Sequence, residues 1–221
     1  MLFKRLVLPM FLVCLLAAPA HADVSQTPTS RVKEGVDLLI SVLSDPKAED
    51  PAHRDEMVQK LRAEAEKFID FKLVTMYAVG RPWTTMTPQM QDDLTEAFIQ
   101  LLERSYLKQI PSYGGQDVNY TGEQVEGNRA KVFTELVDKD KKIIVEFRLR
   151  IVQEQWMIYD VVAEGVSLVA NYRSQFSQVL NTGTPEDLLK QIRDRIEKLD
   201  SGQDDGSQGD GSQVTAEPQQ G

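Results

Sequence analysis

The sequence predicts an α+β fold in which helices wrap one face of a four-stranded antiparallel sheet, with a cleft between the two layers. Apolar residues recur at helical spacing over 30–106, alternate with polar residues over 118–162, and return to helical spacing after Ser167. Because helices and strands occupy separate stretches, they should form separate layers rather than alternating βαβ units. A concave sheet under helices tends to leave a cleft, which is a common place for an apolar ligand.

The first half of the chain shows the start and stop signals of helices. Thr29 or Ser30 is predicted to cap the first helix, which Asp45-Pro46 should end, and a second helix is expected to follow Asp50-Pro51. A short apolar helical piece over 71–79 ends at Gly80. Thr87-Pro88 then supplies the cap and first-turn proline of a long helix with an apolar inner face. This face reads Met90, Leu94, Ala97 or Phe98, Leu101 and Leu102, with Tyr106 further along.

The middle of the chain has a period of two residues. Strands are expected at 118–120, 130–136, 143–151 and 156–162, with turns at 126–128 and 138–141. These short connections favour an antiparallel meander. The third strand is the clearest, because its alternate residues separate into an apolar set and a charged set. The sheet should therefore be covered on one side only.

The stretch 156–176 turns a strand directly into an amphipathic helix. Glu164-Gly165 interrupts the apolar run, and a new helical face starts after Ser167. A last helix opens at Thr184-Pro185. From Ser201 the chain is Gly, Gln, Asp and Ser with almost nothing apolar, so 201–221 is predicted to be a disordered acidic tail.

The first 22 residues have the three parts of a secretory signal peptide: a basic start at Lys4 and Arg5, an apolar core over 6–16, and Ala20-His21-Ala22 as a cleavage pattern. We expect a soluble exported domain over 23–200. Cleavage removes the only cysteine, Cys14, which excludes a disulfide, a thiol nucleophile and a cysteine metal cluster. The net charge of −9 becomes −11 when the two basic residues are lost, and no basic stripe points to nucleic acid.

Catalytic chemistry has few candidates. A carboxylate such as Asp160 or Glu164 in an apolar cleft could act as a base. The simpler interpretation is a corner-capping role, in which the carboxylate accepts hydrogen bonds at the turn between the last strand and the next helix. Ser167 has no histidine near it in the sequence, which favours a helix cap over a nucleophile. Tyr172 and Arg173 could meet a phosphate head group at the mouth of a cleft, while surface pairing of Arg173 with an acidic neighbour stays equally open.

Two stretches carry a resemblance to a known family. The specific one is DVVAEGVSLVANYRSQF at 160–176, preceded by Trp156. The looser one is the spacing of Asp70, Phe71, Met76, Gly80, Trp83, Gln91, Phe98, Leu102 and Tyr106. Together they resemble the MlaC family of periplasmic phospholipid-binding proteins over about residues 30–199, and the tail lies outside the pattern.

The resemblance implies a non-enzymatic carrier that takes a glycerophospholipid across the periplasm. Its implied partners are an outer-membrane lipoprotein–porin complex and an inner-membrane ABC transporter complex with a substrate-binding subunit. No cofactor, metal or catalytic residue is implied, because the phospholipid is cargo. The faces of the predicted strands and helices on which apolar residues lie then predict the pocket wall. It consists of Leu94, Phe98, Leu101, Tyr106, Val132, Val145, Phe147, Leu149, Tyr159, Val161, Val166 and Val169.

Two other function classes stay open on the sequence. One is a small cleft enzyme that uses Asp160 or Glu164, and the other is an envelope protein-interaction module whose apolar stripes are only core. The sequence does not separate wall residues that touch lipid from residues that simply fill the interior.

Overall fold

The computed structural model describes residues 26–45, 53–106, 117–138 and 141–202. The predicted signal peptide at 1–22 and the predicted tail from 203 onward lie outside the described residues. The elements, in chain order, are α1 (Pro28–Leu43), α2 (Arg54–Ala65), α3 (Phe71–Val79), the 3-10 helix η3 (Arg81–Thr85), α4 (Pro88–Tyr106), β1 (Asp117–Glu126), β2 (Arg129–Asp138), β3 (Lys141–Val152), β4 (Gln155–Ala163), β5 (Val166–Ser167), α5 (Leu168–Leu180) and α6 (Pro185–Ser201).

The sheet has five antiparallel strands in the order β1-β2-β3-β4-β5, which corrects the predicted four. The extra strand arises at the corner after β4. Glu164 and Gly165 both have positive φ, 49° and 81°, and reverse the chain. Val166 then pairs with Ala163, and Ser167 with Val162, before α5 begins. Two residues are too few to show a period in the sequence, so this strand could not be predicted.

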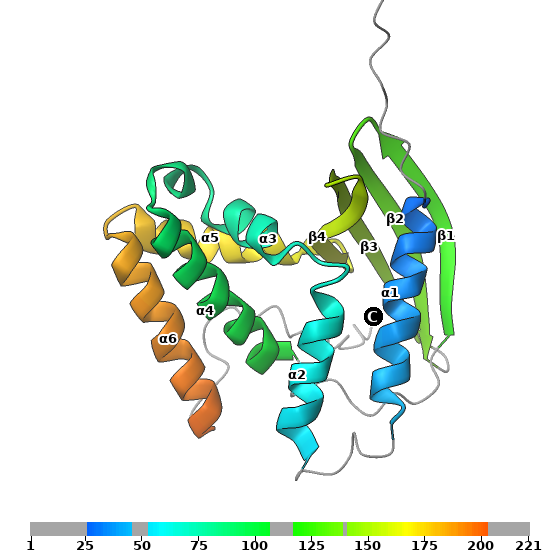
Figure 1. The fold of residues 1–221 in the computed structure, drawn as a ribbon, viewed down its shortest axis with the longest axis horizontal. Helices are drawn as coiled ribbons and strands as arrows, with labels where there is room; N and C mark the ends of the chain where they lie inside the picture. Colours follow the sequence, from blue (N-terminus) through cyan, green and yellow to red (C-terminus); the bar gives the residue numbers. More distant parts are fainter. Residues whose placement is uncertain (1–25, 46–52, 107–116, 139–140, 203–221) are drawn as a thin grey trace, which may run out of the picture.

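The helices form two groups (Figure 1). Helix α1 packs on β1, β2 and β4 and lies beside α2, while α3, α4, α5 and α6 form a helical body beyond the β4 edge of the sheet. The prediction of helices wrapped around one sheet face is therefore only partly right. The reason is that residues 68–70 pair with the edge of β4 at Ile158, which sends α3 away from the sheet face.

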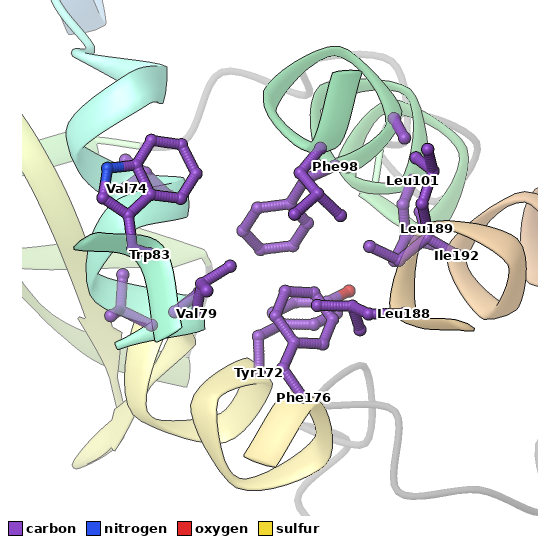
Figure 2. Packing of buried hydrophobic residues seen from close by; sticks show 14 of the residues in the cluster. Val74, Val79, Trp83, Phe98, Leu101, Tyr172, Phe176, Leu188, Leu189 and Ile192 are labelled. Atoms are coloured by element: carbon purple, nitrogen blue, oxygen red, sulfur yellow. The ribbon is translucent and has the colours of Figure 1, made fainter. Parts of the chain in front are cut away.

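Two hydrophobic cores correspond to these two groups. The sheet core lies between α1 and the sheet and includes Val32, Val132 and Leu149. The helical core lies among α3, η3, α4, α5 and α6 and is shown in Figure 2. Ile69, at the link between the groups, packs against both cores. Among the described helices, none combines the length and the apolar character needed to cross a membrane.

Candidate functional site

One face of the sheet is apolar and carries α1. Val132 of β2 pairs with Phe147 of β3, which in turn pairs with Val161 of β4, so the three side chains project from the same face. The face is the one covered by α1, because Val132 lies in the same core as Val32 of that helix. The predicted apolar face of the third strand is confirmed by this register.

The cover over this face is incomplete. Val132 and Leu149 are fully buried at 0% exposure. Further along the strands, five apolar side chains on the same face are only half-buried, and we call them the apolar strip: Leu136, Ile143, Val145, Phe147 and Val161. Removing apolar surface from water is favourable, and this strip is still partly open to water. The strip is therefore the candidate site for an apolar ligand. The predicted cleft itself stays a prediction.

Tyr120 places a polar group on the same face. It pairs with Thr134, which pairs with Val145 of the apolar strip. The Tyr120 hydroxyl oxygen is buried and has no hydrogen-bond partner among the described residues. Burial, helped by the nearby Asp37 carboxylate, raises the pKa of Tyr120 to about 12. The hydroxyl is therefore a neutral donor buried near α1, on the sheet face that bears the apolar strip.

Four predicted wall residues lie elsewhere, in the helical core: Leu94, Phe98, Leu101 and Val169. Figure 2 shows Phe98 and Leu101 of α4 pointing toward α5 and α6, inside the helical body. The Phe98 ring packs edge-on against Tyr172 and Phe176, with centroids 4.8 and 5.1 Å away. Tyr106 is half-buried against the same core. Periodicity in the sequence could not separate these residues from the apolar strip, because both sets are apolar and inward-facing.

Tyr159 and Val166 also lie apart from the strip. A β-bulge opposite Arg148 and Leu149 places Tyr159 toward the charged face, where its ring contacts Tyr77 with centroids 5.1 Å apart. Val166, in the short fifth strand, is 51% exposed. A bulge inserts one residue and so reverses the alternation that the prediction used.

The two predicted head-group residues point in different directions. Tyr172 is buried among Phe98 and Phe176, so its ring belongs to the helical core. Arg173 is exposed, donates a hydrogen bond from Nη1 to the carbonyl oxygen of Tyr77 at 3.4 Å, and fills the space that a side chain at position 80 would enter. Consecutive residues of a helix differ by about 100° in direction, which explains the separation. Their role at a head group stays a prediction.

Asp160 is buried, and its hydrogen bonds hold the start of α5 in place. Its Oδ2 accepts from Ser167 Oγ at 2.6 Å and from Arg148 Nη1 at 3.2 Å, and its Oδ1 accepts from the Val169 backbone N–H at 3.0 Å. Glu164 Oε1 accepts from the Ile144 backbone N–H. A buried carboxylate whose oxygens are engaged by three donors is fully used by the structure, which favours the corner-capping interpretation over a catalytic base.

Replacing Ser167 with alanine tests this interpretation. Ser167 Oγ accepts from the Ala170 backbone N–H at 3.0 Å as the N-cap of α5 and donates to Asp160. Loss of the cap and of the charge-assisted bond should lower the free energy of unfolding by about 1–2 kcal/mol. Urea unfolding measures this loss, and Ser174→Ala on the exposed side of the same helix is the control. An unchanged stability would contradict a capping role.

Helix α2 is joined to α4 by one guanidinium group. Arg62 donates from its two Nη atoms to both carboxylate oxygens of Glu96 and from Nε to Glu66. The hydrogen bonds from Arg62 hold the pKa of Glu96 at about 2. Burial instead raises the pKa of Glu103, whose Oε1 lies 3.9 Å from Arg62 Nε. The pair thus ties the hairpin of α1 and α2 to the helical body.

The depressed pKa of Glu96 predicts a pH dependence of stability. The ionised Glu96 carboxylate stabilises the folded state fully above its unfolded-state pKa of about 4.3. This stabilisation is lost as the pH falls toward the folded-state pKa. We therefore expect Glu96→Gln to be less stable than the wild-type protein near neutral pH and to lose less stability on acidification. Urea unfolding at a series of pH values measures both slopes. Asp92→Asn, which removes an exposed pair with Lys72, is the control and should change little.

Comparison with known proteins places this architecture in a family. A solved structure of a phospholipid-binding protein from Ralstonia solanacearum, in complex with a phospholipid, has a TM-score of 0.67 to this chain at 24% sequence identity. The match covers 77% of this chain and 97% of that one, so the two share a fold. The model of the MlaC protein family matches residues 33–194, which include every predicted wall residue and the two predicted head-group residues. The chain therefore belongs to the MlaC family, as the 160–176 stretch indicates.

Proposed function

We propose that this protein binds a glycerophospholipid and shields its acyl chains against the apolar strip beneath α1. The observation that carries the proposal is the strip itself, a row of half-buried apolar side chains on a sheet face that α1 covers only in part. The phospholipid bound by the Ralstonia solanacearum protein of the same fold supports a lipid as the ligand. Membership of the MlaC family supports the same class of cargo.

The energetics of lipid transfer explain why such a protein is needed. Each CH₂ group exposed to water costs roughly 0.8 kcal/mol, so about thirty such groups of a diacyl lipid cost on the order of 25 kcal/mol. An apolar protein surface that replaces the bilayer removes most of this barrier. No bond in the lipid needs to be broken, and both Asp160 and Glu164 are already occupied by structural hydrogen bonds. The proposed activity is therefore carriage rather than catalysis.

The wider role follows from the family resemblance. We propose that the exported protein acts in the periplasm and moves lipid between an outer-membrane lipoprotein–porin complex and an inner-membrane ABC transporter complex. The acidic net charge, −9 for the full chain and −11 after the predicted cleavage of Lys4 and Arg5, supports docking on proteins, since an anionic membrane surface repels the protein on average.

Organic-solvent extraction of the gently purified full chain tests lipid binding. We expect glycerophospholipid at close to one molecule per chain, identified by mass spectrometry and quantified by phosphorus content. An Asp160→Asn variant should still transfer labelled lipid between vesicles and release no fatty acid. A protein that carries no lipid after purification, and takes none from vesicles, would overturn the proposal. Lipid hydrolysis that disappears in the variant would favour the enzyme alternative.

A further inference from the structure

The sheet face opposite the apolar strip holds a concentration of positive charge. Arg129 of β2 pairs directly with Arg150 of β3, and the next residues on the same face, Lys131 and Arg148, also pair with each other. Four cationic side chains thus form two adjacent cross-strand pairs, and we call each of these pairs a row. The excess is local, because the chain as a whole has 34 acidic and 25 basic residues.

Carboxylates form ion pairs with only one of these two rows, although Glu126 of β1 also lies opposite Arg129 in the register. Arg148 lies 2.7 Å from Glu146 and 3.2 Å from Asp160, and Lys131 lies 3.8 Å from Glu146. Within the described part of the chain, neither Arg129 nor Arg150 has a carboxylate in ion-pair contact. Like charges directly opposite each other in an antiparallel pair are destabilising. A bound anion between the two guanidinium groups would reverse that effect.

Hydroxyl groups from two further elements stand beside these arginines. Arg150 Nη1 donates to the Tyr77 hydroxyl oxygen of α3 at 3.2 Å, which leaves the hydroxyl proton for another acceptor. The Tyr159 ring of β4 contacts the Tyr77 ring. Burial raises the pKa of Tyr159 although the Arg129 and Arg148 charges act to lower it, so its hydroxyl is a neutral donor on the same charged face as these arginines. Strand register, the Arg150–Tyr77 hydrogen bond and the Tyr77–Tyr159 ring contact therefore place donors from β2, β3, β4 and α3 on the same part of the charged face.

We propose that Arg129 and Arg150, with the hydroxyls of Tyr77 and Tyr159, form a binding site for a phosphate group. One arginine satisfies both oxygens of a carboxylate, whereas two guanidinium groups and two hydroxyls match the several acceptor oxygens of a phosphate. The site lies on the sheet face away from the apolar strip, so it goes beyond the proposed carriage of lipid. The phosphate can come from a lipid head group or from free phosphate, since the recognised chemistry is the same.

Titration of the full-length protein with inorganic phosphate, followed by calorimetry, tests the site. We expect saturable binding that weakens at least tenfold in the double variant Arg129→Gln/Arg150→Gln. The control Lys131→Gln lies in the adjacent row, already faces Glu146, and should change the affinity less than twofold. The double variant removes the like-charge pair together with the Arg150–Tyr77 hydrogen bond, and circular dichroism checks that it folds.

Two further measurements distinguish a lipid head group from free phosphate as the ligand, and phosphate binding from lipid carriage. Sedimentation with phosphatidylcholine vesicles that carry phosphatidic acid asks whether a lipid head group occupies the site. If inorganic phosphate and the vesicles both bind, and both need the two arginines, the site takes a lipid head group. If only inorganic phosphate binds, the site takes free phosphate. Equal phosphate affinity in the wild-type and the double variant, or no saturable binding, would overturn the proposal. Val145→Glu, which alters the apolar strip, should leave phosphate binding intact, so this test is independent of lipid carriage.

Discussion

A Val145→Glu variant should purify with at least tenfold less phospholipid than the wild-type protein. Val145 lies in the middle of the apolar strip and pairs with the buried Thr134 on one side and Ala163 on the other. An acyl chain placed on the strip would remove water from the new carboxylate, at a cost of several kcal/mol for an unpaired charge. Phosphorus analysis of the purified protein measures the loss directly.

Ile144→Glu provides a matched control in the same strand. Ile144 is the adjacent residue, points to the opposite face and is 57% exposed, so a carboxylate there stays in water. We expect this variant to keep its lipid. If both variants retain lipid equally, the apolar strip is not the lipid site. Should the Val145→Glu variant fail to fold, the nearly isosteric Val145→Thr should still show a smaller decrease in lipid content, with circular dichroism as the check.

A Phe98→Ala variant should lose about 3–5 kcal/mol of unfolding free energy, the usual range for a large aromatic side chain removed from a core. Phe98 is 1% exposed and lies at the centre of the helical core, between α4, α5 and α6 (Figure 2). Its edge-on contacts with Tyr172 and Phe176 would also be lost. Urea unfolding at neutral pH measures the change.

The same variant also tests whether the predicted wall residues of the helical core touch lipid or only fill the core. Below its unfolding temperature, Phe98→Ala should still bind lipid if the helical core is filled by its own side chains. A protein of unchanged stability that no longer binds lipid would instead place Phe98 at the ligand. Ile144→Ala, an exposed apolar truncation, is the control for stability and should cost less than about 1 kcal/mol.

Local patterns in the sequence were sufficient for most of the secondary structure. The cap of α5 at Ser167, the stop at Gly80 and the alternation of β3 all rest on residues close together in the chain, and the structure confirms them. The last helix extends through Ser201, one residue into the predicted tail. The stretch 160–176 also carried enough specific residues to identify the family, which the family match confirms.

The arrangement of these elements depended on contacts between distant residues. Pairing of residues 68–70 with β4 sends α3 to the side, so the predicted wall divides between a helical core and the apolar strip. The bulge in β4 turns Tyr159 to the face that bears Arg129 and Arg150. The chemistry of a residue and its local period can be read along the chain. The face on which it lies is decided by register and packing, because one inserted residue in a strand reverses every side chain that follows.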